Sequence, residues 1–212
     1  MALKSFRSIL VVSFLVLFFS SFFPVERAHA LGKNPYTGGP DLPALSEFVS
    51  QVTDGQTGEL RGLYVPDLFA APVIQQPDGD HEFVSPSQNT LTQFSLASRF
   101  GSTGLLAHNY LAGERFFLLE EGQKFYLIYG DGQIAAFRVK EIQSYQALDP
   151  NSTASPFLSM ENGALLTTSD LFLEVYNRPG SVILQTCILK DNDPSWGRLF
   201  VIAEPYSGEP QH

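Results

Sequence analysis

The chain has 212 residues, which is enough for one domain with a hydrophobic core and hardly enough for two. Apolar residues make up 44% of the chain and charged residues 17%, as in an ordinary globular protein and unlike a disordered one. The formal net charge of -9 argues against a nucleic-acid-binding protein, because such a protein needs a basic surface to neutralise phosphates. The single cysteine excludes an intramolecular disulfide framework and a cysteine-based zinc site.

Residues 1–30 predict a secretory signal that is cleaved. Lys4 and Arg7 supply a positive start, an apolar run follows over Ile9–Phe23, and Ala28-His29-Ala30 is typical of a cleavage site. The apolar run has about fifteen residues, whereas a membrane-spanning helix needs roughly twenty. Removal of this segment leaves 10 basic and 21 acidic residues, a formal net charge of -11. An exported, acidic protein without disulfides fits the outside of a bacterial cell, so we expect an extracellular or cell-surface location.

The next segment predicts a lead-in followed by a short helix. Gly32–Pro40 is rich in Gly and Pro, which is typical of flexible backbone. Asp41 is expected to cap a helix over Leu42–Val52, where apolar residues recur at helical spacing. The expected organisation is a signal peptide at 1–30, the lead-in and helix at 31–60, the main domain at 61–205 and a disordered tail at 206–212.

From Arg61 onward, short apolar runs between turns predict a mostly β domain. Eighteen Phe and eight Tyr favour a β-rich core. Gly130-Asp131-Gly132, between Lys124–Tyr129 and Gln133–Ile142, is a strong hairpin signal. Strands at intervals of roughly ten residues predict a closed barrel or a sandwich. The other predicted strands are Leu63–Pro66, Phe69–Ile74, Thr92–Ala97, Gly104–His108, Leu171–Tyr176, Ser181–Ile188 and Gly197–Ala203, and Asn151–Gly163 is a predicted loop.

Three side chains are candidates for chemistry. Cys187 ends an apolar strand, where a thiol is either buried and inert or, beside a positive charge, a nucleophile. His108 follows an apolar run, whereas His81 lies in a polar turn and His212 is the last residue. Arg198 opens the final apolar strand and would lie beside the thiol if the two strands were neighbours. Each residue alone would more often be structural, and the three together favour a site.

The motifs around these residues resemble those of the sortase family, the cysteine transpeptidases of bacterial surfaces. Ile183-Leu184-Gln185-Thr186-Cys187 is similar to the family's Thr-Leu-x-Thr-Cys strand, with Ile in place of the first Thr. Leu106-Ala107-His108-Asn109 is similar to its small-residue-then-His motif, and Arg198 stands about a dozen residues after the cysteine, as in the family. The resemblance extends over roughly Gly62–Glu204. The order of the three residues along the chain, His then Cys then Arg, is specific to this family.

The resemblance implies a sortase-like closed β-barrel with short helices, and a transpeptidase. Cys187 would attack a peptide carbonyl to form a thioacyl-enzyme, and His108 would act as general acid and then as base. Arg198 would hold the carbonyl or its oxyanion. Thr186 and Asn109 are candidate substrate-binding residues. The expected partners are a sorting-signal peptide and an amine acceptor on a cell-wall precursor or protein, with membrane contact only through an uncleaved leader.

Two alternatives to the transpeptidase stay open at this point. One is a catalytically inactive barrel that binds peptides or cell-wall components, and the other is a cysteine peptidase that releases the acyl group to water. We expect no cofactor and no metal ligands in the site. Asp78, Asp80 and Glu82 could hold calcium, as in some sortases, but an exposed turn is the favoured interpretation.

Overall fold

The computed structural model describes residues 42–208. The expected signal peptide at 1–30 and the Gly/Pro-rich lead-in lie outside these residues, as does the end of the expected tail. Ten strands are present in the described part of the chain: β1 (Leu60–Val65), β2 (Phe69–Gln75), β3 (Leu91–Phe94), β4 (Thr103–Leu106), β5 (Lys124–Tyr129), β6 (Ile134–Ala147), β7 (Phe157–Ser159), β8 (Leu165–Leu166), β9 (Val182–Lys190) and β10 (Asp193–Pro205). Its helices are α1 (Leu45–Val52), α2 (Ser95–Ser98), the 3-10 helix η1 (Ala112–Leu118) and α3 (Thr168–Tyr176).

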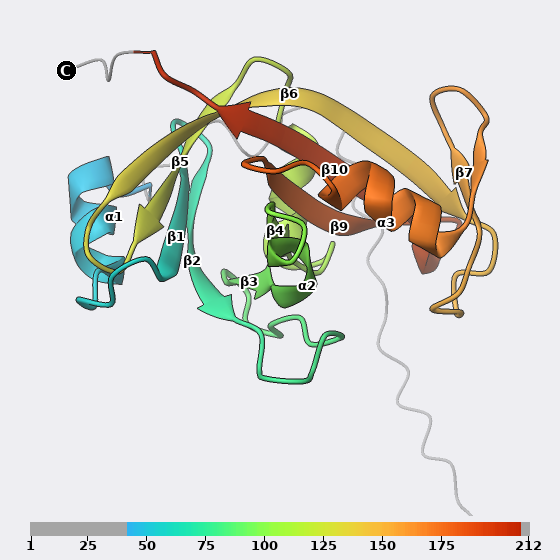
Figure 1. Ribbon diagram of the computed structural model, residues 1–212, viewed down its shortest axis with the longest axis horizontal. Coiled ribbons are helices and arrows are strands. Elements are labelled where there is room, and N and C mark those ends of the chain that lie inside the picture. The colour runs from blue at the N-terminus through green and yellow to red at the C-terminus, as the bar shows by residue number, and fades with distance from the viewer. Residues whose placement is uncertain (1–41, 209–212) are drawn as a thin grey trace, which may run out of the picture. The chain divides into compact units, whose positions relative to one another are not determined.

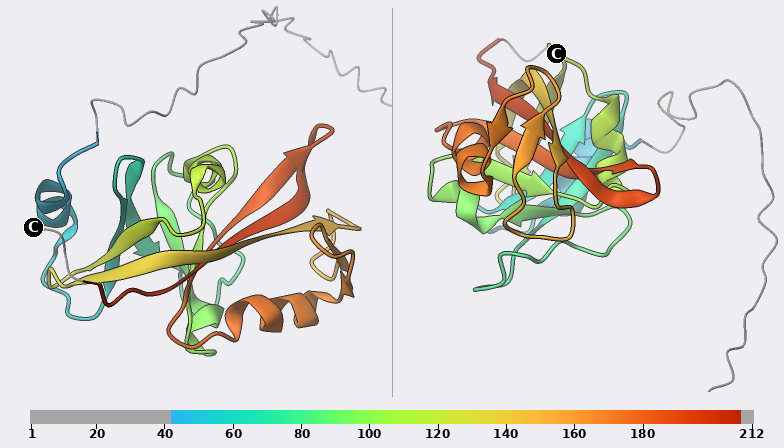
Figure 2. Two further views of the ribbon diagram at one scale, coloured as in Figure 1. Left: turned by 90° about the horizontal axis from the view of Figure 1, so that it is seen from above. Right: turned by 90° about the vertical axis from the view of Figure 1, so that its right-hand side faces the viewer.

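The strands form one sheet that closes on itself. Its order is β10-β9-β4-β3-β2-β1-β5-β6-β7-β8, and a further pairing of β10 with β6 closes the first eight strands into a barrel (Figures 1 and 2). The β2–β3 and β4–β9 pairs are parallel and the other pairs are antiparallel. The short β7–β8 hairpin pairs with the C-terminal end of β6, outside the barrel closure. The predicted mostly β, closed barrel with short helices is therefore confirmed.

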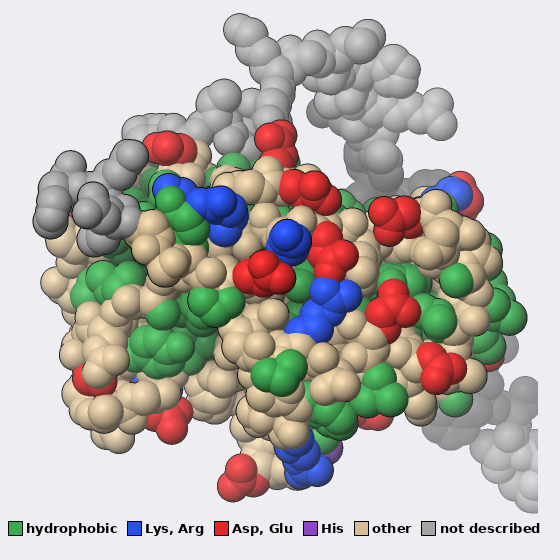
Figure 3. Space-filling model, turned by 45° about the horizontal axis from the view of Figure 1, so that its top comes forward, with side chains coloured by type: hydrophobic (Ala, Val, Ile, Leu, Met, Phe, Trp, Pro, Cys, Tyr) green, Lys and Arg blue, Asp and Glu red, His purple; other side chains and the backbone are tan. Residues whose placement is uncertain are grey.

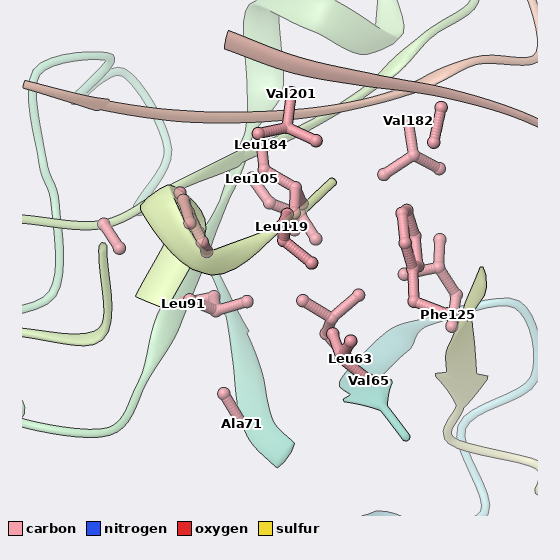
Figure 4. Close-up of a cluster of buried hydrophobic side chains, with 14 of the residues drawn as sticks. Leu63, Val65, Ala71, Leu91, Leu105, Leu119, Phe125, Val182, Leu184 and Val201 are labelled. Atoms are coloured by element: carbon pink, nitrogen blue, oxygen red, sulfur yellow. The ribbon is translucent and has the colours of Figure 1, made fainter. Parts of the chain in front are cut away.

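Apolar side chains from all around the barrel fill its interior. Figure 4 shows these side chains converging from strands that are distant in sequence. Leu63, Leu105, Phe125, Leu184 and Val201 are completely or almost completely removed from solvent. Because adjacent residues of a strand point to opposite faces, this interior set takes alternate residues of each strand.

A second apolar cluster covers the outside of β9 and β10. Ile183 and Phe200 project from the strands, and Leu171, Val175 and Tyr176 of α3 pack on them. The ring of Phe200 meets those of Tyr145 and Tyr176 edge-on, with centroids 5.8 Å and 6.3 Å away. Figure 1 shows α3 running along this side of the barrel. We call the face of β9 and β10 toward α3 their outer face.

The helix α3 replaces a predicted strand, so the strand expected over Leu171–Tyr176 is wrong. Thr167 and Asp170 form a capping box, in which each side chain accepts a hydrogen bond from the other residue's backbone N–H (3.1 Å and 3.4 Å). Leu171 and Val175, four residues apart, are buried against the barrel. A short run of aromatic and branched residues is compatible with a strand or with a buried helix. In this segment the capping box favours the helix.

Other boundaries differ for local reasons. The helix α1 begins at Leu45 with Ala44 as its N-cap, not at Asp41, because a residue that precedes a proline disfavours helical backbone and Pro43 follows Leu42. The strand expected over Thr92–Ala97 ends at Phe94, and α2 follows it. The loop expected over Asn151–Gly163 contains β7.

Charged side chains of both signs are interspersed on the surface shown in Figure 3, with apolar side chains between them and no continuous basic area. This side of the molecule therefore lacks the positive footprint that a nucleic acid requires. Within residues 42–208, no helix combines the length and the apolar character needed to cross a membrane.

We predict that the outer cluster contributes strongly to stability. Phe200 is 3% exposed, so Phe200→Ala should lower the free energy of unfolding by about 3–5 kcal/mol, through lost burial and the cavity left behind. Leu173→Ala is the matched control, because Leu173 lies on α3 but is 46% exposed. Denaturant unfolding followed by circular dichroism measures both changes. Equal losses in the two variants would contradict the packing described here.

Candidate active site

Cys187 and Arg198 lie directly opposite each other on neighbouring strands. Residue Cys187 of β9 pairs with Arg198 of β10 in the antiparallel ladder. Side chains of directly opposite residues project from the same face of a sheet, with Cβ atoms roughly 4.5–5.5 Å apart. The thiol and the guanidinium therefore share one face, as expected if the two strands were neighbours.

His108 is aligned with Cys187 from the other side of β9. The parallel β4–β9 ladder runs from Thr103 opposite Val182 to Leu106 opposite Gln185. Each pair of this ladder is therefore 79 positions apart in sequence. The alignment continues past the end of β4, because the Thr186 hydroxyl donates to the carbonyl of Ala107 at 2.8 Å, and these two residues are also 79 positions apart. One residue further along, this offset aligns His108 with Cys187. We call His108, Cys187 and Arg198 the row.

The thiol and the guanidinium project from the outer face of the barrel. Along β9, Val182 and Leu184 belong to the interior core, whereas Ile183 belongs to the outer cluster. Cys187 lies four residues after Ile183, and because side chains alternate between the two faces of a strand, it projects outward as Ile183 does. Arg198 agrees with this assignment, because its guanidinium carbon lies 5.9 Å from the centroid of the Phe157 ring, a member of the outer cluster. Both residues are partly exposed.

A bulge holds the Arg198 side chain. Between the paired residues of the β9–β10 hairpin, Pro194–Trp196 stand opposite the single residue Leu189, and we call these three residues the bulge. The terminal nitrogen Nη1 of Arg198 donates to the carbonyl of Ser195 at 3.0 Å and to that of Gly197 at 2.9 Å. These two bonds fix one end of the planar guanidinium, which carries five N–H donors in all.

A tight turn holds His108 at the end of β4. Its carbonyl accepts hydrogen bonds from the backbone N–H groups of Leu111 and Gly113, both at 3.0 Å. The ring of Tyr110 stacks on the imidazole, with centroids 5.2 Å apart and planes 18° apart. Tyr110 is 68% exposed, so it covers the imidazole from the solvent side. The sequence carried no periodic signal that would have singled out Tyr110.

Thr186 and Asn109, the candidate substrate-binding residues, both bond within the protein. Thr186 is 2% exposed, and its hydroxyl joins β9 to the segment that carries His108. The Asn109 side chain is partly exposed, and its Nδ2 donates to the carbonyl of Pro194 at 3.0 Å. Contact with a substrate stays a prediction for both residues.

The helix α3 bounds the outer face on one side of the row. Tyr176 donates a hydrogen bond to Oε1 of Gln185, which lies two residues before Cys187 on the same face. Burial raises the pKa of the Tyr176 phenol far above its ordinary value, so the hydroxyl remains a donor at physiological pH. The outer face is therefore covered by α3 as far as Gln185, and Cys187 lies next to the edge of this cover.

An apolar hollow of about 260 Å³ lies between the His108 turn and the β9–β10 hairpin. Three apolar side chains around it, those of Tyr110, Phe117 and Leu189, are largely exposed. Ile188 lines the hollow as well, and Tyr110, which stacks on His108, joins the hollow to the row. The full lining is Asn109, Tyr110, Phe117, Ile188, Leu189 and Pro194.

The acidic turn at Asp78, Asp80 and Glu82 has a local structural role. Asp80 accepts a hydrogen bond from the backbone N–H of Phe83 at 3.1 Å, which is typical of an Asp-stabilised turn. Across residues 42–208, no three side chains of His, Cys, Asp or Glu gather as a metal ion would require.

No protein-family model and no curated protein sequence match this chain. Similar solved structures include sortase A from Corynebacterium diphtheriae, with 13% identity and a TM-score of 0.49 over 74% of this chain and 65% of that one. Sortase C-1 from Actinomyces oris has 14% identity and a TM-score of 0.49, over 84% of this chain and 91% of that one. Sortase C1 from Streptococcus suis has 16% identity and a TM-score of 0.48, over 77% and 79%. The sequence motifs around His108, Cys187 and Arg198 resemble those of the same family.

We predict that Gly113→Ala disrupts the row. A Cβ at this position would lie 2.3 Å from the Thr186 hydroxyl and 2.7 Å from the carbonyl of His108, so the turn would have to move away from β9. We expect the variant to lose about 1–3 kcal/mol of stability and to change the reactivity of Cys187 toward thiol reagents. Gly122→Ala is a useful control, because a Cβ there meets nothing within 4 Å and its effect comes from the positive φ of 86° alone. Wild-type reactivity in Gly113→Ala would show that this close contact does not hold His108 in place.

Proposed function

We propose that the protein is a sortase-like cysteine transpeptidase, which cleaves a peptide through a thioacyl intermediate on Cys187 and transfers the acyl group to an amine. The observation that supports this proposal is the row, in which strand register pairs Cys187 with Arg198 and aligns His108 with Cys187 at one end of the barrel. A free thiol is only a few per cent thiolate at neutral pH, so a nucleophilic cysteine needs a neighbouring positive charge. Arg198 provides a permanent one.

In the first half of the proposed reaction, the Cys187 thiolate attacks the carbonyl carbon of the scissile peptide bond. The negative charge moves to the carbonyl oxygen, and N–H groups of Arg198 stabilise it. When the C–N bond breaks, the His108 imidazolium gives its proton to the leaving amine, and the acyl group stays on sulfur as a thioester. The two bonds from Arg198 Nη1 to the carbonyls of Ser195 and Gly197 keep the guanidinium ready for this oxyanion.

In the second half, an incoming amine attacks the thioester carbon. Neutral His108 accepts the proton that the amine loses, the C–S bond breaks, and the thiolate and imidazolium are restored. Arg198 binds the second oxyanion as it bound the first. Water in place of the amine would release the acyl group as a carboxylic acid, so the identity of the acceptor separates a transferase from a hydrolase.

The partners that we propose are a sorting-signal peptide and an amine of the cell wall or of another protein, outside the cell. The partial exposure of Cys187 and Arg198 on the outer face is compatible with an extended peptide as substrate. The signal-like sequence of residues 1–30 supports export. The net charge of -9 disfavours a nucleic acid as partner.

The first test concerns the thiol. If the row activates Cys187, a methanethiosulfonate reagent should modify the folded protein at neutral pH faster than it modifies free cysteine, because the thiolate is the reacting species. We expect His108→Ala to slow this reaction. His81→Ala is the matched control, since His81 Nδ1 is bonded to the Ser95 hydroxyl, 2.9 Å away, outside the row.

Mass spectrometry with candidate peptides then tests for a thioacyl adduct on Cys187. An adduct that added amines remove supports a transferase, and one removed only by water supports the peptidase. A thiol that reacts only after denaturation would identify Cys187 as a buried structural residue and leave the barrel as a binding module.

A second test separates charge from geometry at Arg198. Arg198→Lys keeps a positive charge near the thiol but loses the planar fork that bonds the bulge, so its turnover should fall on the order of a hundredfold or more if Arg198 holds the oxyanion. Arg198→Ala should fall at least as far. Arg61→Lys controls for the substitution itself, because Arg61 lies on β1, outside the row, and is bonded to Asp54. Near-wild-type turnover in Arg198→Lys would refute the oxyanion role, and wild-type rates in both Arg198 variants would remove Arg198 from the site.

A further inference from the structure

The three residues of the row are not held equally by backbone pairing. Cys187 and Arg198 are paired within the β9–β10 ladder. The β4–β9 ladder ends at Leu106 opposite Gln185, two residues before His108. Beyond Leu106, one backbone bond, from the Ala107 N–H to the Gln185 carbonyl at 3.2 Å, still joins this segment to β9, and side-chain bonds add to it.

One such bond joins the His108 turn directly to the bulge. Nδ2 of Asn109 donates to the carbonyl of Pro194 at 3.0 Å. The next carbonyl along the bulge, that of Ser195, accepts the bond from Arg198 Nη1, also at 3.0 Å. Two consecutive carbonyls thus hold the residue next to His108 and the guanidinium of the row.

The bulge is well suited to this role. Proline has no backbone N–H and cannot donate to a ladder, so Pro194 fits where the regular pairing of β9 and β10 stops. Oδ1 of Asp193 accepts a hydrogen bond from the backbone N–H of Ser195 at 2.8 Å, which fixes the start of the bulge. The carbonyls of Pro194 and Ser195 are therefore presented from a fixed backbone.

We propose that Asn109 is a positioning residue, which holds His108 at its place in the row by bonding to the Pro194 carbonyl. Asn109 acts through His108 and does not touch the reacting atoms. This inference deepens the proposed function and rests on it. It also gives Asn109 a task other than the substrate contact expected from its place in the motif. A carboxylate would not serve, because an ionised Asp has only acceptors to offer to a carbonyl oxygen.

The test is a double-mutant cycle on the reactivity of Cys187. The rate of modification by a methanethiosulfonate reagent is measured from mildly acidic to mildly alkaline pH in the wild type, Asn109→Leu, His108→Ala and the double variant. We expect Asn109→Leu to lower the rate at neutral pH about tenfold, the effect of losing one well-placed hydrogen bond, and to change its pH profile toward that of His108→Ala. In the His108→Ala background, Asn109→Leu should change nothing further.

Two more variants keep the result interpretable. Asn109→Asp keeps the shape of the side chain but loses the donor, so it should behave as Asn109→Leu does and serves if the latter fails to fold. Asn162→Leu is the matched control, because the Asn162 side chain accepts a bond from Ala164 in the β7–β8 turn, away from the row. It should leave the rate and its pH profile unchanged.

The possible failures are distinguishable. If the wild-type thiol reacts no faster than free cysteine, the proposed function is overturned, and the role of Asn109 with it. If the wild-type thiol is activated but Asn109→Leu and Asn109→Asp match it, only the positioning role is overturned. A loss that adds in full to that of His108→Ala would also overturn it, since Asn109 would then act independently of His108.

Discussion

Because β4 pairs in parallel with β9, a histidine and a cysteine that are 79 residues apart come to one end of the barrel. A shift of this pairing by a single residue would turn every side chain of β9 to the opposite face and move the thiol into the interior. The interior core prevents the shift, because Leu105 and Leu184 are fully buried in it. A shifted register would put polar neighbours in the interior and lose the free energy gained by burying these apolar side chains. The register that the core requires is therefore the register that aligns the row.

The same constraint assigns different tasks to the two faces of β9. Interior residues such as Val182 and Leu184 hold the barrel together, and Ile183 and Gln185 hold α3 on the outer face. Cys187 follows in the outer series at the point where the cover of α3 ends. The thiol is thus connected to a rigid strand and still reached from solvent, which is the combination that a nucleophile on a scaffold needs.

Much of this arrangement could be predicted from local sequence, and some of it could not. The hairpin at Gly130-Asp131-Gly132 follows from turn chemistry, and it joins β5 and β6 as expected. The strand over Leu171–Tyr176 was predicted wrongly, because its apolar run suits either structure and the deciding capping box lies before it. The adjacency of Cys187 and Arg198 was expected only if their strands were neighbours, and that condition is a tertiary property of the sheet. The contact between Asn109 and Pro194 had no sequence signal, since it joins two irregular segments.

These irregular segments lie where the row does because the sheet ends there. Regular ladders fix strands cooperatively, but at the end of β4 and at the bulge the regular ladder stops, and turn bonds and side-chain bonds satisfy the backbone groups there. Thr186, Asn109 and Arg198 each make such a bond to a carbonyl. Single bonds of this kind contribute only about 0.5–1.5 kcal/mol, so they adjust the geometry of the row without deciding whether the barrel folds. It follows that substitutions at these bonds should alter reactivity more than stability, whereas substitutions in the two apolar clusters should do the reverse.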